Sequence, residues 1–151
     1  MLRVLSRALS GSYDNTLRLW DPATADSLRT LEGHTSSVAA VALSADGSRA
    51  LSGSHDWTLR MWNLATGDSL RTLEGHSGSV TAVALPADGS RALSSSYDAT
   101  VRLWDLATGE RLAEFTADAA VHCMALARDD LIVAGSVDGK IHILEIREPC
   151  R

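Results

Sequence analysis

A 42-residue repeat dominates this sequence. The segment RALSGSYD begins at Arg7, RALSGSHD at Arg49 and RALSSSYD at Arg91, so each copy starts 42 residues after the one before it. Residues 7–48 and 49–90 differ at only ten positions. Such a repeat predicts a row of similar units that stack on one another, because one short unit cannot bury its apolar surface alone.

Each repeat has the pattern of four short β-strands. In the second unit we expect strand a near 38–44, strand b near 49–54, strand c near 58–64 and strand d near 69–74. These segments are rich in Val, Leu, Thr, Ala and Ser, and turn sequences such as Ala-Asp-Gly at 45–47 separate them. Strand a does not alternate apolar with polar residues, which predicts a strand covered on both faces. No segment has helical periodicity, so the fold class is all-β.

Four-stranded units of this length are typical of β-propellers, whose blades stack radially. Gly-His and Trp-Asp pairs recur at the repeat spacing. They are Gly33-His34, Gly75-His76, Trp20-Asp21, Trp104-Asp105 and the variant Trp62-Asn63. These motifs resemble the WD-repeat (WD40) family, and the resemblance implies propeller blades over 7–110. It weakens beyond 110, where Ala134 replaces the expected strand b Ser and Leu144 replaces the Trp.

The repeat divides the chain into a partial propeller of about 3.5 blades. Blade 1 (1–32) supplies strands b to d, blades 2 (33–74) and 3 (75–116) are complete, and a degenerate blade 4 (117–147) supplies strands a to c. This division predicts fourteen strands within the single segment 1–151. Because propellers have about four to eight blades, we expect completion by self-association, as a homodimer, or by further blades upstream in a longer protein.

The resemblance also implies a structural network in each blade, made of a His before strand a, a Ser of strand b, an Asp of the b–c turn and the Trp of strand c. The residues at these positions are His34, Ser52, Asp56 and Trp62 in blade 2, and His76, Ser94, Asp98 and Trp104 in blade 3. Such a network satisfies polar groups that would otherwise be buried without partners.

Ser, His and Asp are also the components of a hydrolase triad. A catalytic triad occurs once, beside a cleft, whereas this set recurs at the blade period and ends on a Trp. No GxSxG, P-loop, HExxH or GxGxxG motif is present. We therefore expect a structural network, no enzymatic activity and no cofactor.

Composition argues against several classes of partner. The formal net charge is -5, and the Arg residues are spread evenly rather than clustered as in nucleic-acid-binding proteins. No apolar run approaches the roughly 20 residues that span a bilayer. Cys123 and Cys150 are too few for a disulfide framework and lack the paired spacing of a metal site, so we expect no metal and a cytoplasmic location.

The resemblance places partner binding on the face that carries the b–c turns and the d–a loops. Residues that flank the turn Asp vary between repeats, and we expect them to contact the partner. They are Tyr13, Asn15, His55, Trp57 and Tyr97. Trp57 stands out because the other repeats have Asn, Ala or Gly there, and exposed Trp residues are common in interfaces. Alternatively, Trp57 packs on a neighbouring blade.

Together these features predict a non-enzymatic scaffold that binds a protein or peptide on this face. The alternative is a C-terminal sensor or regulatory repeat tail of a multidomain signalling enzyme, such as a kinase or an ATPase. An upstream catalytic domain in the reading frame would distinguish the two.

Overall fold

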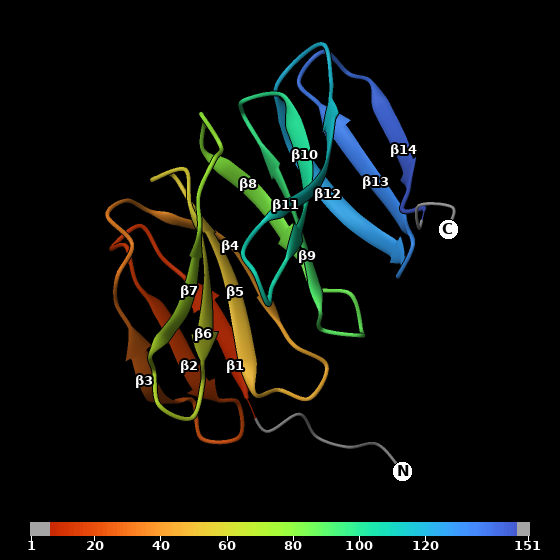
Figure 1. Ribbon diagram of the computed structural model, residues 1–151. Coiled ribbons are helices and arrows are strands. Elements are labelled where there is room, and N and C mark those ends of the chain that lie inside the picture. Colours follow the sequence, from red (N-terminus) through yellow and green to blue (C-terminus); the bar gives the residue numbers. More distant parts are fainter. Residues whose placement is uncertain (1–6, 148–151) are drawn as a thin grey trace.

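The computed structural model describes residues 7–147, which form fourteen β-strands and no helix. The strands are β1 (Ala8–Gly11), β2 (Leu17–Asp21), β3 (Asp26–Leu31), β4 (Val38–Leu43), β5 (Arg49–Ser54), β6 (Leu59–Asn63), β7 (Ser69–Leu73), β8 (Val80–Ala84), β9 (Arg91–Ser96), β10 (Thr100–Asp105), β11 (Arg111–Thr116), β12 (Val121–Arg128), β13 (Leu131–Ser136) and β14 (Ile141–Glu145). They form four antiparallel sheets that follow one another in space (Figure 1). The predicted all-β partial propeller is confirmed.

Each sheet is one blade, with its strands in sequence order. Blades 2 (β4–β7) and 3 (β8–β11) have all four strands, a to d. Blade 1 (β1–β3) supplies strands b to d and blade 4 (β12–β14) strands a to c. Residues 1–6, which the sequence assigned to blade 1, and residues 148–151 lie outside the described residues.

Side-chain hydrogen bonds fix the a–b hairpins. In blade 2, Oδ1 of Asp46 accepts hydrogen bonds from Oγ of Ser44 at 2.7 Å and from the backbone N of Ser48 at 3.0 Å. These bonds, the one from Ser44 foremost, lower the pKa of Asp46 to about 2. Gly47 supplies the left-handed conformation that the turn needs (φ 70°). The turn thereby sets the register of β4 against β5, in which Leu43 pairs with Ala50.

The hydrophobic core lies between neighbouring sheets. At the first two junctions one face of the preceding blade, here called the aliphatic face, packs on an Ala- and Trp-containing face of the next blade, here called the tryptophan face. Blade 1 contributes Leu17, Leu19 and Leu31, which pack on Ala50, Trp62 and Leu64 of blade 2. Blade 2 contributes Leu51, Leu59, Met61 and Leu73, which pack on Ala92 and Trp104 of blade 3. Burying each large aliphatic side chain contributes about 1.5–3 kcal/mol, so each blade depends on its neighbours.

Strand a lies between neighbouring blades but is only partly buried. The prediction of a strand covered on both faces holds for β4, which contacts β1 of blade 1 and β8 of blade 3, although only Val38 is buried and the other residues are half-buried or exposed. β8 follows the same pattern, with Val80 buried. Strand a is the edge strand of its sheet and pairs only with strand b, so its free edge towards the centre of the arc stays accessible.

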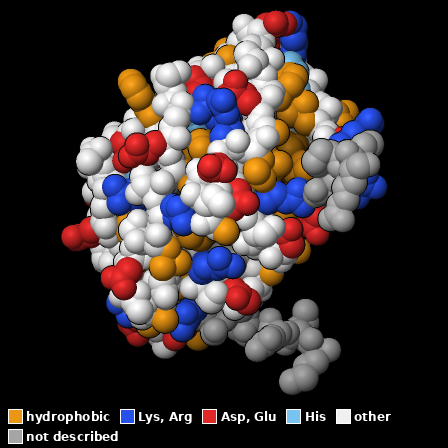
Figure 2. All heavy atoms as spheres, in the orientation of Figure 1, with side chains coloured by type: hydrophobic (Ala, Val, Ile, Leu, Met, Phe, Trp, Pro, Cys, Tyr) orange, Lys and Arg blue, Asp and Glu red, His pale blue; other side chains and the backbone are white. Residues whose placement is uncertain are grey.

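Blade 4 leaves the outer part of its junction open. A groove of about 830 Å³ lies between blades 3 and 4. Apolar side chains of β10, β11 and β14 line it, among them Leu103, Phe115 and Leu144. Figure 2 shows hydrophobic side chains gathered at this end of the molecule. The groove lies where the outermost strand of blade 4 would run, because that sheet has three strands.

Candidate functional site

The b–c turns and the d–a loops of the blades lie together at one end of the sheets. We call this surface the turn face and define it by the b–c turns 12–16, 54–58, 96–100 and 136–140 with the d–a loops 32–37, 74–79 and 117–120. Backbone hydrogen bonds join the two kinds of loop, from His55 N to Ser37 O at 2.9 Å and from Tyr97 N to Ser79 O at 3.0 Å. Each turn is therefore held against the loop that precedes strand a of its own blade.

A buried chain of hydrogen bonds supports the turn face in blade 2. Nε1 of Trp62 donates to Oγ of Ser52 at 2.9 Å, and Oγ of Ser52 lies 2.7 Å from Nε2 of His34. Nδ1 of His34 lies 2.7 Å from Oδ2 of Asp56. Because a carboxylate only accepts, Nδ1 carries the proton and Nε2 accepts from the Ser52 hydroxyl. The structure thus brings the four expected residues into one directed chain.

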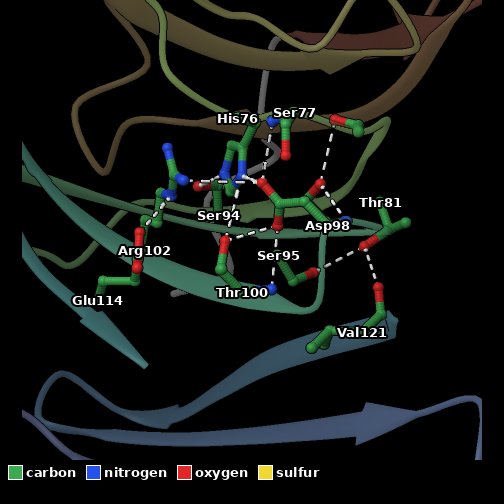
Figure 3. A network of polar contacts seen from close by, with 12 residues as sticks. His76, Ser77, Thr81, Ser94, Ser95, Asp98, Thr100, Arg102, Glu114 and Val121 are labelled. Carbon is green, nitrogen blue, oxygen red and sulfur yellow. Dashed lines mark hydrogen bonds and ion pairs between the residues drawn. The ribbon is translucent and has the colours of Figure 1, made fainter. Parts of the chain in front are cut away.

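Blade 3 repeats this arrangement, and Figure 3 shows its Ser94, His76 and Asp98. Trp104 Nε1 donates to Ser94 Oγ at 2.8 Å, Ser94 Oγ lies 2.8 Å from His76 Nε2, and His76 Nδ1 lies 2.7 Å from Asp98 Oδ2. An ion pair is added here, in which Nε of Arg102 lies 2.9 Å from Oε2 of Glu114. The hydrogen-bond networks of blades 2 and 3 therefore share one geometry.

The Asp at the end of each chain organises both loops of its blade. Asp56 accepts hydrogen bonds from the backbone N of Thr35 in the d–a loop at 3.0 Å and of Thr58 after the b–c turn at 2.9 Å. Burial by itself raises the pKa of Asp56, but the hydrogen bonds from Thr58 and His34 outweigh it and lower the pKa overall. The same balance lowers the pKa of Asp98 to about 2. Both side chains are therefore carboxylates at neutral pH.

Both network histidines are held neutral. Burial lowers the pKa of His34, and the hydrogen bond and charge of Asp56 offset only part of this effect. Burial lowers the pKa of His76 in the same way, against the opposing effect of Asp98. A neutral imidazole donates at Nδ1 and accepts at Nε2, as this hydrogen-bond chain requires.

The Ser-His-Asp geometry is not placed for nucleophilic attack. Ser52 and Ser94 are fully buried, and each hydroxyl oxygen already accepts the indole N–H of a Trp. A hydrolase nucleophile must reach the substrate carbonyl beside an oxyanion hole. The network therefore supports the loops, and the surface that those loops present is the candidate site.

The end blades keep only parts of the network. In blade 1, Trp20 Nε1 donates to Ser10 Oγ at 2.8 Å, and the turn Asp14 accepts from Thr16. In blade 4, Asp138 accepts from the backbone N of Lys140 at 3.3 Å. The Lys140 ammonium also lies 2.6 Å from a carboxylate oxygen of Asp118 in the d–a loop, so an exposed ion pair joins the two loops there.

The five expected contact residues all lie on the b–c turns. Tyr13, Trp57 and Tyr97 are 87%, 52% and 47% exposed, respectively, while His55 is exposed and Asn15 half-buried. Half of the Trp57 surface is therefore in solvent, although the rest is covered. Three consecutive blades thus each present an aromatic side chain on this face.

Trp57 has an unusual backbone conformation. Its φ of 72° lies in the left-handed region, as do those of Asn15 (71°), Ala99 (69°) and Gly139 (85°) at the same position in the other blades. Gly and Asn adopt this conformation readily, whereas for other residues it costs about 1–2 kcal/mol. The turn favours Gly or Asn, so the Trp57 side chain comes at a cost in stability.

A recess lies beside these aromatic residues, between blades 1 and 2. Its volume is about 360 Å³, and its lining includes Tyr13, Ser37, Ala39 and His55. In blade 3 the residue equivalent to Ala39 is Thr81, whose hydroxyl bonds to Ser95 of its own blade and to the carbonyl of Val121 in blade 4. The Ala39 side chain has no such polar group and lies exposed beside the recess.

His122 is a turn-face residue that the sequence did not single out. It occupies the same position at the third junction, where its ring stacks on Tyr97 with centroids 6.2 Å apart. The phenol oxygen of Tyr97 lies 3.3 Å from His122 Nδ1. Aligning strand a of blade 4 on the repeat with a one-residue deletion would have placed His122 beside Tyr97, but the weak match of that blade to the repeat motifs hid this alignment.

Comparison with known proteins decides the family. The family model described as "WD domain, G-beta repeat" matches residues 5–21, 25–63 and 67–105. The chain belongs to the WD40 family. The matched segments cover the three blades that carry the Trp of strand c and end before the degenerate blade 4. WD40 domains generally mediate protein–protein interactions, which agrees with a loop-borne surface held by buried networks.

Individual WD40 relatives match over one repeat. The chain is similar to dynein assembly factor with WD repeat domains 1 from Homo sapiens and from Macaca fascicularis, with 50% identity over 36 residues. The Danio rerio protein of that name is 47% identical over 36 residues. Each match covers 24% of this chain and 9% of the relative, so the chain spans only a small part of the relatives' length.

Residues 7–147 contain no group of three or more His, Cys, Asp or Glu side chains placed to hold a metal ion. The same residues include no helix able to cross a membrane.

Proposed function

We propose that this WD40 chain is a non-enzymatic scaffold that binds a protein or peptide on its turn face. The observation that carries the proposal is Trp57, a half-exposed aromatic residue in a turn conformation that disfavours it. Strained residues that persist on a surface are typical of binding sites. Exposed Trp and Tyr residues supply much of the binding energy in protein interfaces.

The surroundings of Trp57 support a peptide ligand. Tyr13 and Tyr97 extend the aromatic surface over neighbouring blades, and the recess beside Tyr13 and His55 has room for one side chain. The networks of His34 and His76 hold the loops in place, so the loops lose little conformational entropy when a ligand binds. We assign contact roles to Tyr13, Asn15, His55, Trp57 and Tyr97.

The proposal also includes the absence of catalysis and a cytoplasmic location. The burial of Ser52 and Ser94 supports the former. The alternative of a regulatory tail on a signalling enzyme would use the same turn face, and no feature of residues 7–147 favours it over a scaffold.

Peptide-display selection on the purified chain tests the proposal, followed by fluorescence anisotropy with the selected peptide. The triple variant Tyr13→Ala/Trp57→Asn/Tyr97→Ala should weaken binding by at least about tenfold, since exposed aromatic hot spots each contribute more than about 1.4 kcal/mol. The matched control is Leu28→Ala/Leu70→Ala/Leu112→Ala, which removes three half-exposed side chains from the outer strands. Equal loss in both variants, or no enrichment of any peptide on the native chain over the unfolded chain, would contradict the proposal.

A further inference from the structure

The two ends of the arc expose faces that are buried at every internal junction. On blade 4 the aliphatic face consists of Val133, Ile141 and Ile143, which are 36%, 72% and 70% exposed. By strand register these residues correspond to Leu93, Val101 and Leu103 of blade 3, all of which are buried against blade 4. A contiguous apolar face of this kind marks a contact surface.

Blade 1 exposes the opposite kind of face. Its tryptophan face carries Ala8 and Trp20, which correspond to Ala50 and Trp62 of blade 2. Ala50 and Trp62 are fully buried beneath blade 1, whereas Ala8 is exposed and Trp20 half-buried. Within residues 7–147 the chain therefore carries one aliphatic face and one tryptophan face that no other blade covers.

An arginine clamp at the junctions of blades 1–2 and 2–3 indicates which kind of neighbouring blade each end of the arc can accept. Arg29 of β3 donates to the carbonyls of Thr66 and Ala65 in the c–d turn of blade 2, at 2.7 and 2.8 Å. Arg71 of β7 clamps the c–d turn of blade 3 in the same way, bonding Thr108 and Ala107 at 2.8 and 2.6 Å.

Each clamp requires a glycine in the turn that it holds. A Cβ on Gly67 would lie 2.9 Å from Cδ of Arg29, and a Cβ on Gly109 would lie 3.0 Å from Nη1 of Arg71. Both glycines have positive φ, 86° and 81°. An alanine at either position would displace the clamp.

The c–d turn of blade 1 has Ala25 at this glycine position, in the same left-handed conformation (φ 62°). The Ala25 methyl group occupies the space that a clamp would need, so blade 1 fits a preceding neighbour without the arginine. Blades 1 and 2 each bring an arginine to the blade that follows them. Blade 4 ends at strand c within the described residues and has no strand d to carry it. Blade 3, which precedes a blade without a c–d turn, has Ala113 at the clamp position.

We propose that two copies of this chain associate head to tail, with the aliphatic face of blade 4 of each copy packed on the tryptophan face of blade 1 of the other. Two such contacts close a ring of eight blades, within the range of about four to eight that propellers adopt. A head-to-tail contact that closes after two copies gives a defined dimer rather than a filament. The proposal does not depend on partner binding at the turn face.

Light scattering coupled to size-exclusion chromatography over a dilution series tests the proposal. The native chain should show twice its monomer mass of 16.1 kDa. Ile143→Asp places a carboxylate in the contact and should weaken the dimer at least about a hundredfold, because an unpaired buried charge is strongly disfavoured. The matched control Leu70→Asp changes a half-exposed residue of an inner blade and should leave the mass unchanged. Circular dichroism checks that every variant is folded.

A mixing experiment distinguishes head-to-tail contact from other arrangements. Ala8→Asp, at an exposed position of blade 1, should also give monomers. Mixed with Ile143→Asp it should restore a dimer, because one of the two contacts then joins two unmodified faces. Ala8→Asp without effect would instead indicate a symmetric contact between two blade 4 faces and would overturn the proposal. A native chain that stays monomeric, as when other blades of a longer protein cover these faces, or that forms open-ended assemblies, would overturn it as well.

Discussion

The indole Nε1 of Trp62 and the Oγ of Ser52 lie 2.9 Å apart, and this bond connects a blade junction to the turn face. Trp62 packs against the aliphatic face of blade 1, whereas Ser52 passes the hydrogen-bond chain through His34 to Asp56 in the b–c turn. Packing between blades and the shape of the candidate binding surface therefore share one buried set of residues.

Removing the hydroxyl at the centre of this chain should be costly. Ser52→Ala leaves the Trp62 N–H and Nε2 of His34 buried without partners, and each unsatisfied group costs about 1–3 kcal/mol. We expect a loss of about 2–4 kcal/mol in the free energy of unfolding, measured by urea denaturation. The matched change Ser10→Ala affects a half-buried Trp20 that water can reach, so it should cost less than about 1 kcal/mol. Equal losses in the two variants would show that the buried chain contributes nothing beyond one hydrogen bond.

Stability should decrease as the pH falls from neutral. His34 and His76 have pKa values below the unfolded value of 6.5, so below pH 6.5 the unfolded chain binds protons before the native chain does. A second loss should follow between pH 3.8 and about 2, where Asp98 is protonated first in the unfolded chain. Urea midpoints at a series of pH values measure both steps. The double variant His34→Gln/His76→Gln should show a flatter profile around pH 6.5, and a native chain that gains stability on acidification to pH 5.5 would contradict the assignment.

The repeat predicted the fold because each strand boundary and turn residue occurs several times in the sequence. Recurring Ser, His, Asp and Trp positions likewise predicted which side chains meet in the network. Features that differ between blades were harder to predict. The stacking of His122 on Tyr97 depends on the register of the degenerate blade 4, and the clamp of Arg29 on blade 2 joins residues 36 and 37 positions apart whose contact no local pattern indicates.

Trp57 offers a test of whether stability is traded for binding. Trp57→Asn should raise the free energy of unfolding by about 0.5–1 kcal/mol, because Asn tolerates the left-handed turn. The same change should weaken binding of a selected peptide about tenfold, which corresponds to about 1.4 kcal/mol. Ala99→Asn is the control, since it relieves the backbone strain at a similar φ of 69° without removing an aromatic side chain. It should stabilise the chain and leave binding intact. If Trp57→Asn destabilises the chain instead, the covered half of the side chain has a packing role.

The clamp predicts coupling between Arg29 and Gly67. Gly67→Ala places a methyl group 2.9 Å from Cδ of Arg29 at a φ of 86°, so it should cost about 1–2 kcal/mol. Arg29→Ala removes two hydrogen bonds to exposed carbonyls and should cost about 0.5–1.5 kcal/mol. Once the arginine is absent the methyl group has no clamp to displace, so the double variant should lose about 0.5–1 kcal/mol less than the sum.

Ala25→Gly provides the counterpart of this cycle in blade 1. That turn has no clamp within the described residues, so glycine should relieve only the strain of a φ of 62° and stabilise the chain by up to about 1 kcal/mol. Urea denaturation of all four variants gives the coupling directly. Additive losses for Arg29 and Gly67 would mean that glycine serves only the turn conformation. In that case Ala25 would no longer distinguish a clamped from an unclamped neighbour, and the choice of a second copy over an upstream repeat would rest on the dimer measurements alone.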